Sequence, residues 1–263
     1  MKKNDEFYVG YNDESLGANT KNALKKFVLV ALLVVVGVAI VFAITQKQFK
    51  NSTFELSSVT KITGVFHESP YPMLRVELAE NTFKNVLLLG FGKSSVNPYL
   101  EKLRSDVNDL NGKKLSIEGN LIYYNGKTAI QITDKEKLTM VSDATFEIPQ
   151  NVMIGELTLQ GEVIDPKCYF GVMKPGKGKI HRSCAIRCIS GGIPPVLVTT
   201  DDNNLSEYYL IADSNGDPMH KAILPFVGKP SEIKGIVEKS EGWNTIKVDV
   251  ANITLLTTPS NIY

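Results

Sequence analysis

Cysteine is scarce in this chain of 263 residues, and the motifs through which cysteine most often acts are missing. The three cysteines, Cys168, Cys184 and Cys188, lie within 21 residues of one another. No Cys-x-x-Cys pair and no Cys-x-x-Cys-His occurs, so thioredoxin-like exchange and c-type haem attachment both lose their usual motif. The frame Gly-x-Ser-x-Gly is absent too, and Ser190 before two glycines is therefore no nucleophile elbow.

An excess of one charge is also missing. Lysine and arginine number 29 against 28 aspartates and glutamates, which gives a formal net charge of +1. A chain balanced in this way has no global field that would attract nucleic acid or acidic substrates. Aromatic residues interleaved with a basic stripe, the pattern of single-strand binding, are not found either. We therefore expect no nucleic-acid partner, and any basic patch must be local.

Long apolar runs are absent with one exception, residues 27–44. These 18 residues are uncharged and apolar, and as a helix they nearly cross a hydrocarbon core of about 30 Å. A cleaved signal peptide is the main alternative, but its charged region would be unusually long and no clear small-x-small site follows. A buried core helix is disfavoured because every face of the segment is apolar. The pattern predicts a single transmembrane helix.

Lysines predict the orientation of this helix. Three precede it closely and two follow it, a modest bias that keeps the N-terminus in the cytoplasm. We expect residues 1–26 to be a cytoplasmic tail and the bulk of the chain to lie on the periplasmic or extracytoplasmic side. The cysteines would then sit in an oxidising compartment, where thiols tend to be paired, bound to metal or deliberately reactive.

Short alternating runs with turn signals fill the rest of the chain, and they repeat. Residues 111–132 align with residues 227–248: each has a Gly-Lys loop, a strand interrupted by Gly119 or Gly235, a hairpin turn and a closing strand. Strand-internal glycines suit the sharp coiling of a five-stranded barrel of the OB type. The repeat predicts a mainly β fold with two tandem small OB-like β-barrels, each able to fold alone, at residues 54–145 and 151–263. Alternation does not fix topology, so a sandwich remains open.

The second copy carries an insertion of roughly thirty residues, 165–195, between its first and second strands. It contains all three cysteines, a basic loop, and a short helix that ends at Gly191-Gly192. At about 100° per residue, His181, Cys184 and Cys188 fall within an arc of about 60° on that helix. Cys168 can fold back onto the same face. Between residues 165 and 188 there are six cations and one acid, and such a field favours thiolates.

Three interpretations of the cysteines compete. Cys168, His181, Cys184 and Cys188 can form a mononuclear site, since three thiolates and an imidazole make a familiar tetrahedral set for a transition metal such as zinc, copper or iron. Alternatively, a disulfide from Cys168 to one helix cysteine staples the insertion to the barrel. The third interpretation, three buried small hydrophobes, is disfavoured by the spacing. The first two remain close to even, and which cofactor is bound, if any, stays open.

The sequence of the insertion resembles a motif of uncharacterised bacterial membrane-anchored proteins with OB-like extracytoplasmic domains. The motif reads Asp-x-Lys-Cys-Tyr from residue 165, His-x-x-Cys-Ala-x-x-Cys from 181 and Gly-Gly-Ile-Pro-Pro from 191. Some of these proteins accompany respiratory or metal-handling proteins. The resemblance implies a bacterial inner-membrane location and protein partners in a membrane complex.

These observations together predict a function. We expect a membrane-anchored, non-catalytic accessory subunit that binds a metal or redox centre. A disulfide-stapled docking module without metal, or a thiol-disulfide redox protein, is the alternative. His67 and His220 lie in turn-like contexts, where an exposed histidine is the ordinary expectation.

Overall fold

A computed structural model describes residues 18–45, 52–107, 109–201, 203 and 205–257. Of the predicted cytoplasmic tail, residues 1–26, the part up to residue 17 lies outside the described residues. The chain divides into two compact units, residues 1–50 and residues 51–263. The first contains helix α1 (Ala18–Thr45), which includes the predicted span. The helical stretch over residues 19–45 is long and apolar enough to cross a membrane.

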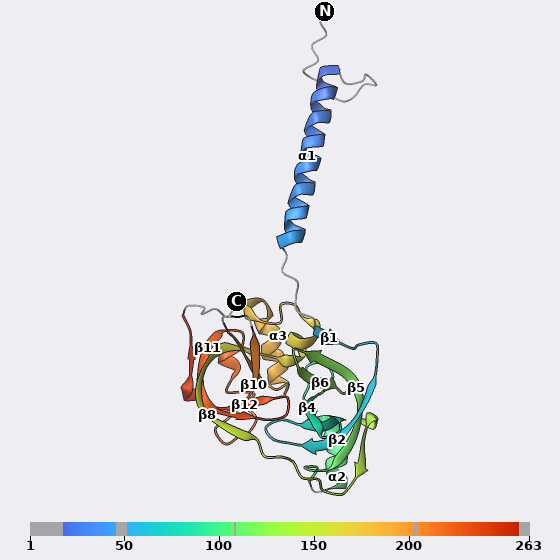
Figure 1. Cartoon of the computed structure of the whole chain (residues 1–263), viewed down its shortest axis with the longest axis vertical. Helices are drawn as coiled ribbons and strands as arrows, with labels where there is room; N and C mark the ends of the chain where they lie inside the picture. Colours follow the sequence, from blue (N-terminus) through green and yellow to red (C-terminus); the bar gives the residue numbers. More distant parts are fainter. Residues whose placement is uncertain (1–17, 46–51, 108, 202, 204, 258–263) are drawn as a thin grey trace, which may run out of the picture. The chain divides into compact units, whose positions relative to one another are not determined.

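The first half of the second unit is a closed five-stranded barrel (Figure 1). Its strands are β2 (Thr60–His67), β3 (Met73–Ala79), β4 (Thr82–Leu89), β5 (Lys114–Tyr124) and β6 (Lys127–Gln131). They follow the order β5-β2-β3-β4-β6, and β6 closes onto β5. The pairing of β4 with β6 is parallel, and the others around the barrel are antiparallel. Helix α2 (Asn97–Asp106) lies between β4 and β5 in the chain.

The second half repeats this plan. Its strands are β8 (Val152–Ile164), β9 (Val196–Thr200), β10 (Ser206–Ala212), β11 (Pro230–Lys239) and β12 (Asn244–Lys247). The order is β12-β10-β9-β8-β11, closed by β11 and β12, with the parallel pair now β10 and β12. Numbered within each barrel, both orders read 1-2-3-5-4. The prediction of two tandem OB-like barrels is therefore confirmed, and the sandwich is excluded.

Shorter elements complete the two barrels. Strands β1 (Ser52–Phe54) and β7 (Leu138–Ser142) pair with β5, and β13 (Ile253–Leu255) pairs with β11. Single helical turns are η1 (Lys135–Lys137), η3 (Leu224–Phe226) and η4 (Val250–Asn252). The insertion between β8 and β9 contains a π-helical turn, η2 (Cys168–Val172), and helix α3 (Gly178–Ser190).

Local chemistry explains where the strands bend and turn. A Cβ added to Gly119 would lie 2.4 Å from the Gln131 carbonyl oxygen, and one added to Gly235 would lie 2.4 Å from that of Lys247. The fourth strand of each barrel thus crosses the fifth too closely for any side chain. The Asn125-Gly126 hairpin has positive φ at both residues, 46° and 78°, as its tight turn requires.

Strand β1 ends at Phe54, although alternating residues continue to Val59. The Asn120 amide donates to the carbonyl oxygens of Glu55 and Ser58. These bonds hold residues 55–58 as a turn, and the strand resumes only at Thr60.

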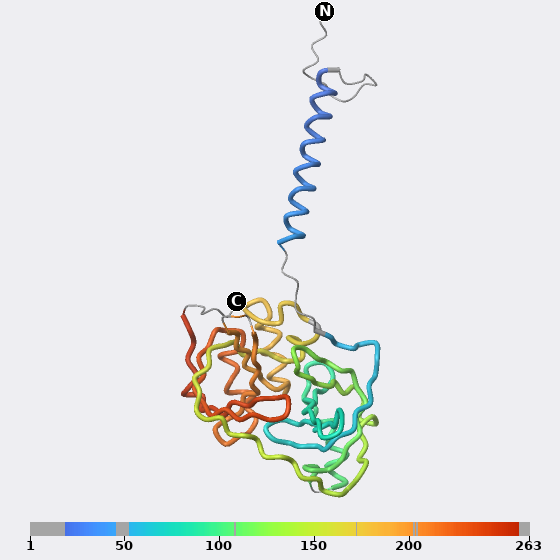
Figure 2. The backbone as a smooth tube through the Cα atoms, in the orientation of Figure 1, coloured from blue at the N-terminus to red at the C-terminus, as the bar shows by residue number. Residues whose placement is uncertain are grey.

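One hydrophobic cluster is shared by the two barrels and each barrel has a second cluster of its own; together they form one compact unit. Tyr71 of the first barrel is 1 % exposed; its hydroxyl donates to the Ile211 carbonyl oxygen and accepts from the Met219 amide. Trp243 of the second barrel is fully buried and donates to the Thr128 carbonyl oxygen. In Figure 1, α3 lies between the two barrels, and Figure 2 shows the same path of the chain. The independent folding of residues 151–263 stays a prediction, since the removal of residues 1–150 would also expose the shared cluster.

Candidate functional site

Helix α3 presents most of the predicted site, and its ends are well defined. At the start, the Gly178 amide donates to the carboxylate of Glu162, which is fully buried; an acid is favourable at a helix N-terminus. At the end, the Gly191 amide bonds the Arg187 and Cys188 carbonyl oxygens, and Gly192 adopts a φ of 98°. This is the glycine-based C-terminal geometry that stops a helix. The predicted short helix with its Gly-Gly stop is thus present.

The three cysteines form one group, which we call the cysteine cluster. The sulfur atoms of Cys168, Cys184 and Cys188 all lie within 4.8 Å of one another. Cys168 comes from η2 and the other two from α3, so the π-helical turn folds back onto the helix face as expected. Cys168 and Cys188 are buried and Cys184 is partly exposed. The cluster therefore opens to solvent on the side of Cys184.

His181 belongs to a second group that shares Cys168. Donor atoms of Asp165, Cys168 and His181 lie within 4.8 Å of one another, and His181 is not a member of the cysteine cluster. The His181 Nε2 lies 3.1 Å from Asp165 Oδ2, and the other carboxylate oxygen accepts from the Cys168 amide at 2.8 Å. Asp165 is fully buried and His181 is 2 % exposed. The carboxylate therefore fixes both the imidazole ring and the turn that carries Cys168.

Two lysines connect the site to the first barrel. Lys93, in the loop after β4, donates to Cys184 Sγ at 3.2 Å, and this bond raises the pKa of the lysine. Lys167 donates to the carbonyl oxygens of Gly90 and Gly92 at 2.8 and 2.7 Å. Burial lowers the pKa of Lys167 to about 8. The site is thus built by the insertion and closed by a loop of the first barrel.

Hydrogen bonding inside the cluster distinguishes its thiols. The bond between Cys168 and Cys188 lowers the pKa of Cys188 and raises that of Cys168. Within this pair Cys168 donates the hydrogen bond and Cys188 accepts it, which favours the thiolate form at Cys188 over Cys168. All three cysteines are free. A disulfide between Cys184 and Cys188 is disfavoured because Cβ atoms four residues apart on a helix are about 5–6 Å apart, whereas a disulfide needs about 3.5–4.5 Å.

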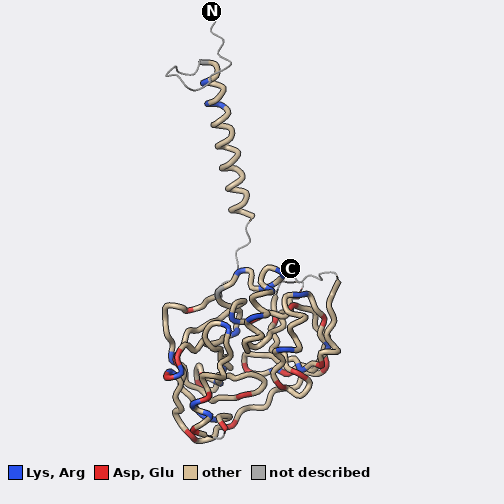
Figure 3. Tube along the Cα trace, turned by 180° about the vertical axis from the view of Figure 1, so that it is seen from behind, with Lys and Arg blue, Asp and Glu red and all other residues tan. Residues whose placement is uncertain are grey.

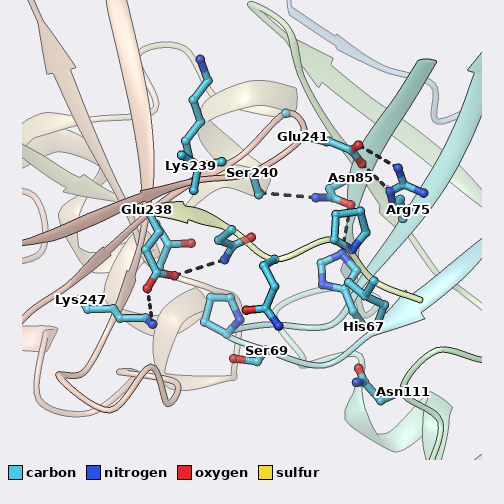
Figure 4. Close-up of a pocket in the computed structure, with 18 residues that line it drawn as sticks. His67, Ser69, Arg75, Asn85, Asn111, Glu238, Lys239, Ser240, Glu241 and Lys247 are labelled. Atoms are coloured by element: carbon cyan, nitrogen blue, oxygen red, sulfur yellow. Dashed lines mark hydrogen bonds and ion pairs between the residues drawn. The ribbon is translucent and has the colours of Figure 1, made fainter. Parts of the chain in front are cut away.

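A cavity outside this site lies between the barrels. It has a volume of about 810 Å³. In its wall, Arg75 of the first barrel holds Glu241 of the second through two bonds of 2.5 and 2.8 Å. His67 Nε2 lies 3.1 Å from Asn85 Oδ1, and the Asn85 amide reaches Ser240 (Figure 4). These groups bind one another across the cavity, so they join the barrels.

His67 is 8 % exposed, so the expectation of an exposed histidine is wrong at this position. Burial lowers the pKa of the imidazole.

The lowered pKa of His67 makes stability depend on pH. Below about pH 6.5 the unfolded chain takes up a proton at His67 that the folded chain does not. We expect the free energy of unfolding to fall as the pH drops from 7.5 to 5.5, by up to about 1.4 kcal/mol per pH unit for this group. His67→Gln should flatten the slope in urea titrations, leaving the share of His220, whose pKa burial also lowers. An unchanged slope would contradict this role.

Sequence reasoning found the cysteines and His181 but not their supporting residues. Asp165 and Lys167 belong to the sequence motif of the insertion, but their spacing indicates no contact with the cysteines or with His181. Lys93 lies 91 residues before Cys184, and no local pattern indicates such a contact. No family model, curated protein or solved structure matches this chain.

Proposed function

We propose that this protein is a membrane-anchored metal-binding protein whose site is the cysteine cluster, with His181 as fourth ligand. The observation that carries the proposal is the convergence of three sulfur atoms within 4.8 Å. In a tetrahedral site with metal–sulfur bonds of about 2.3 Å, the sulfurs lie about 3.8 Å apart. The cluster needs only a small contraction to reach that geometry, and Cys168 already lies within reach of His181.

Asp165 acts as the support of the histidine ligand. A histidine that binds metal through one nitrogen usually donates its other N–H to a carboxylate, which fixes the ring. The contact of 3.1 Å between His181 Nε2 and Asp165 Oδ2 has this form. Asp165→Asn should keep the ligands but weaken metal binding by about 10–100-fold.

The charges around the site favour a divalent ion. Three thiolates and the Asp165 carboxylate carry four negative charges, and Lys93 and Lys167 carry two positive ones. Among these groups the negative charges exceed the positive ones by two, which one divalent cation would balance. Soft thiolate and imidazole ligands suit zinc or ferrous iron. Asp165 and Cys188 are buried, and uncompensated negative charge is costly there.

The staple alternative requires a disulfide from Cys168 to Cys184 or Cys188, and all three thiols are free. The anchor is α1, and the motif resemblance supports an inner-membrane protein whose barrels lie outside the cytoplasm and serve a membrane complex as a non-catalytic accessory subunit.

Cobalt(II) titration of the full chain in detergent, purified anaerobically and stripped of metal, tests the site. We expect thiolate-to-cobalt charge-transfer absorption that saturates at about one ion per chain and is displaced by zinc. Asp165→Asn should saturate at the same level with weaker affinity. Absence of the charge-transfer band would overturn the proposal.

A further inference from the structure

Residues 173–180, which we call the insertion tip, form a segment that is both basic and apolar, and five of its eight residues are exposed. It has three lysines and no acidic residue. Met173 exposes 43 % and Ile180 exposes 84 % of its surface, and Lys174 and Lys179 are exposed as well. Figure 3 shows both signs of charge spread over the barrels, whereas the tip carries positive charge alone.

The tip lies beside β1. Lys174 Nζ is 5.2 Å from the centre of the Tyr124 ring and donates to the Tyr169 carbonyl oxygen. Tyr124 pairs with Ser52 at the start of β1. At the other end of β1, Phe54 packs against Gly171 of η2, where an added Cβ would lie 3.0 Å from the Phe54 ring. The first strand of the barrel unit and the insertion tip therefore share one end of that unit (Figure 2).

Chain length limits how far β1 can be from a membrane crossed by α1. Six residues, 46–51, separate the end of α1 from the start of β1. An extended residue spans at most about 3.6 Å, so the seven steps from residue 45 to residue 52 cover at most about 25 Å. If α1 crosses the membrane, the start of β1 can therefore lie no farther than about 25 Å from the end of that helix, which keeps the tip beside β1 near the bilayer surface.

We propose that the insertion tip contacts the headgroup region of anionic phospholipids, with its lysines at the phosphates and Ile180 inserted among the acyl chains. Lysines attract an anionic surface within a Debye length, and an exposed aliphatic side chain gains by leaving water. The proposal rests on the anchoring by α1 proposed above. It gives the site a defined location, with the cysteine cluster held near the membrane surface.

Depth-dependent quenching tests the contact in the full chain reconstituted in nanodiscs. Ile180→Trp places a fluorophore at the tip, while the buried Trp243 gives a constant background that wild type measures. With acyl-brominated lipid in discs that contain phosphatidylglycerol, we expect quenching at least about twofold above that of the control Val141→Trp. Val141 lies in β7 and is 54 % exposed. Its neighbour Met140 pairs with Leu115 of β5. Leu115 is nine residues from Tyr124, or about 30 Å along the strand.

Lys179→Glu added to Ile180→Trp should reduce the quenching to the control level, as should 0.5 M salt or purely zwitterionic discs. Equal quenching at positions 180 and 141 in discs that carry the chain would overturn the surface contact and leave the anchor and the metal site standing. A chain that fails to co-elute with the discs would overturn the anchor and this contact together. Metal content of each variant reports separately on the cysteine cluster.

Discussion

Replacing Cys184 by serine should lower the metal bound to the purified full-length chain from about one ion per chain to less than about a tenth of that. Cys184 is one of four proposed ligands and is partly exposed, so its loss removes a thiolate with little damage to the core. Elemental analysis of anaerobically purified protein measures the effect. Ser183→Ala, at an exposed position of the same helix, is the matched control and should retain its metal.

His181→Ala separates the metal site from a disulfide staple. As the loss of a fourth ligand, it should reduce bound metal about as strongly as the loss of Cys184. A staple has no need of a histidine, so in that case the variant would be nearly neutral, and Cys168→Ala would instead cost about 2–5 kcal/mol. Unchanged metal content and thermal stability in His181→Ala would contradict its role as a ligand.

Trp243→Ala should cost about 3–5 kcal/mol of unfolding free energy. The indole is fully buried, lies 5.9 Å from the Phe170 ring and donates to the Thr128 carbonyl oxygen across the barrel boundary. Its removal leaves a cavity where the barrels and the insertion meet. Urea unfolding measures the loss, and Val250→Ala, 40 % exposed in η4, is the control.

The number of steps in the urea unfolding curve reports whether the two barrels unfold together. Because they share a hydrophobic cluster, we expect a single transition, which Trp243→Ala shifts to lower urea. Two separate transitions in wild type, with only one moved by the substitution, would show that the barrels are independent.

The repeat made the barrels predictable from sequence. Gly119 and Gly235 occupy equivalent positions in the aligned copies, and both prove to be places where a neighbouring carbonyl oxygen excludes a side chain. The Asn125-Gly126 turn and the insertion between the first two strands follow from the same alignment. Each of these features depends on residues close together in the chain, where spacing and turn chemistry are informative.

The association of the barrels was not predictable in this way. A repeat indicates strands, but it does not indicate that Tyr71 and Trp243 meet residues of the other barrel, because both contacts join residues more than a hundred positions apart. The same limit explains the site: helical spacing brought Cys184 and Cys188 together, whereas the hydrogen bond of Lys93 depends on the packing of a loop from the first barrel. The contact of Asp165 with His181 depends on the turn between β8 and α3, which the sequence pattern does not specify.

The most direct test of the metal site is a thiol count and a metal analysis on the same sample of full-length protein, purified anaerobically. We predict about one divalent ion per chain, no thiol that reacts rapidly in the native protein, and three reactive thiols after chelation and unfolding. One thiol without metal would indicate a disulfide, and three reactive thiols without metal would indicate a vacant cluster with no affinity. Either of these two results would contradict the account.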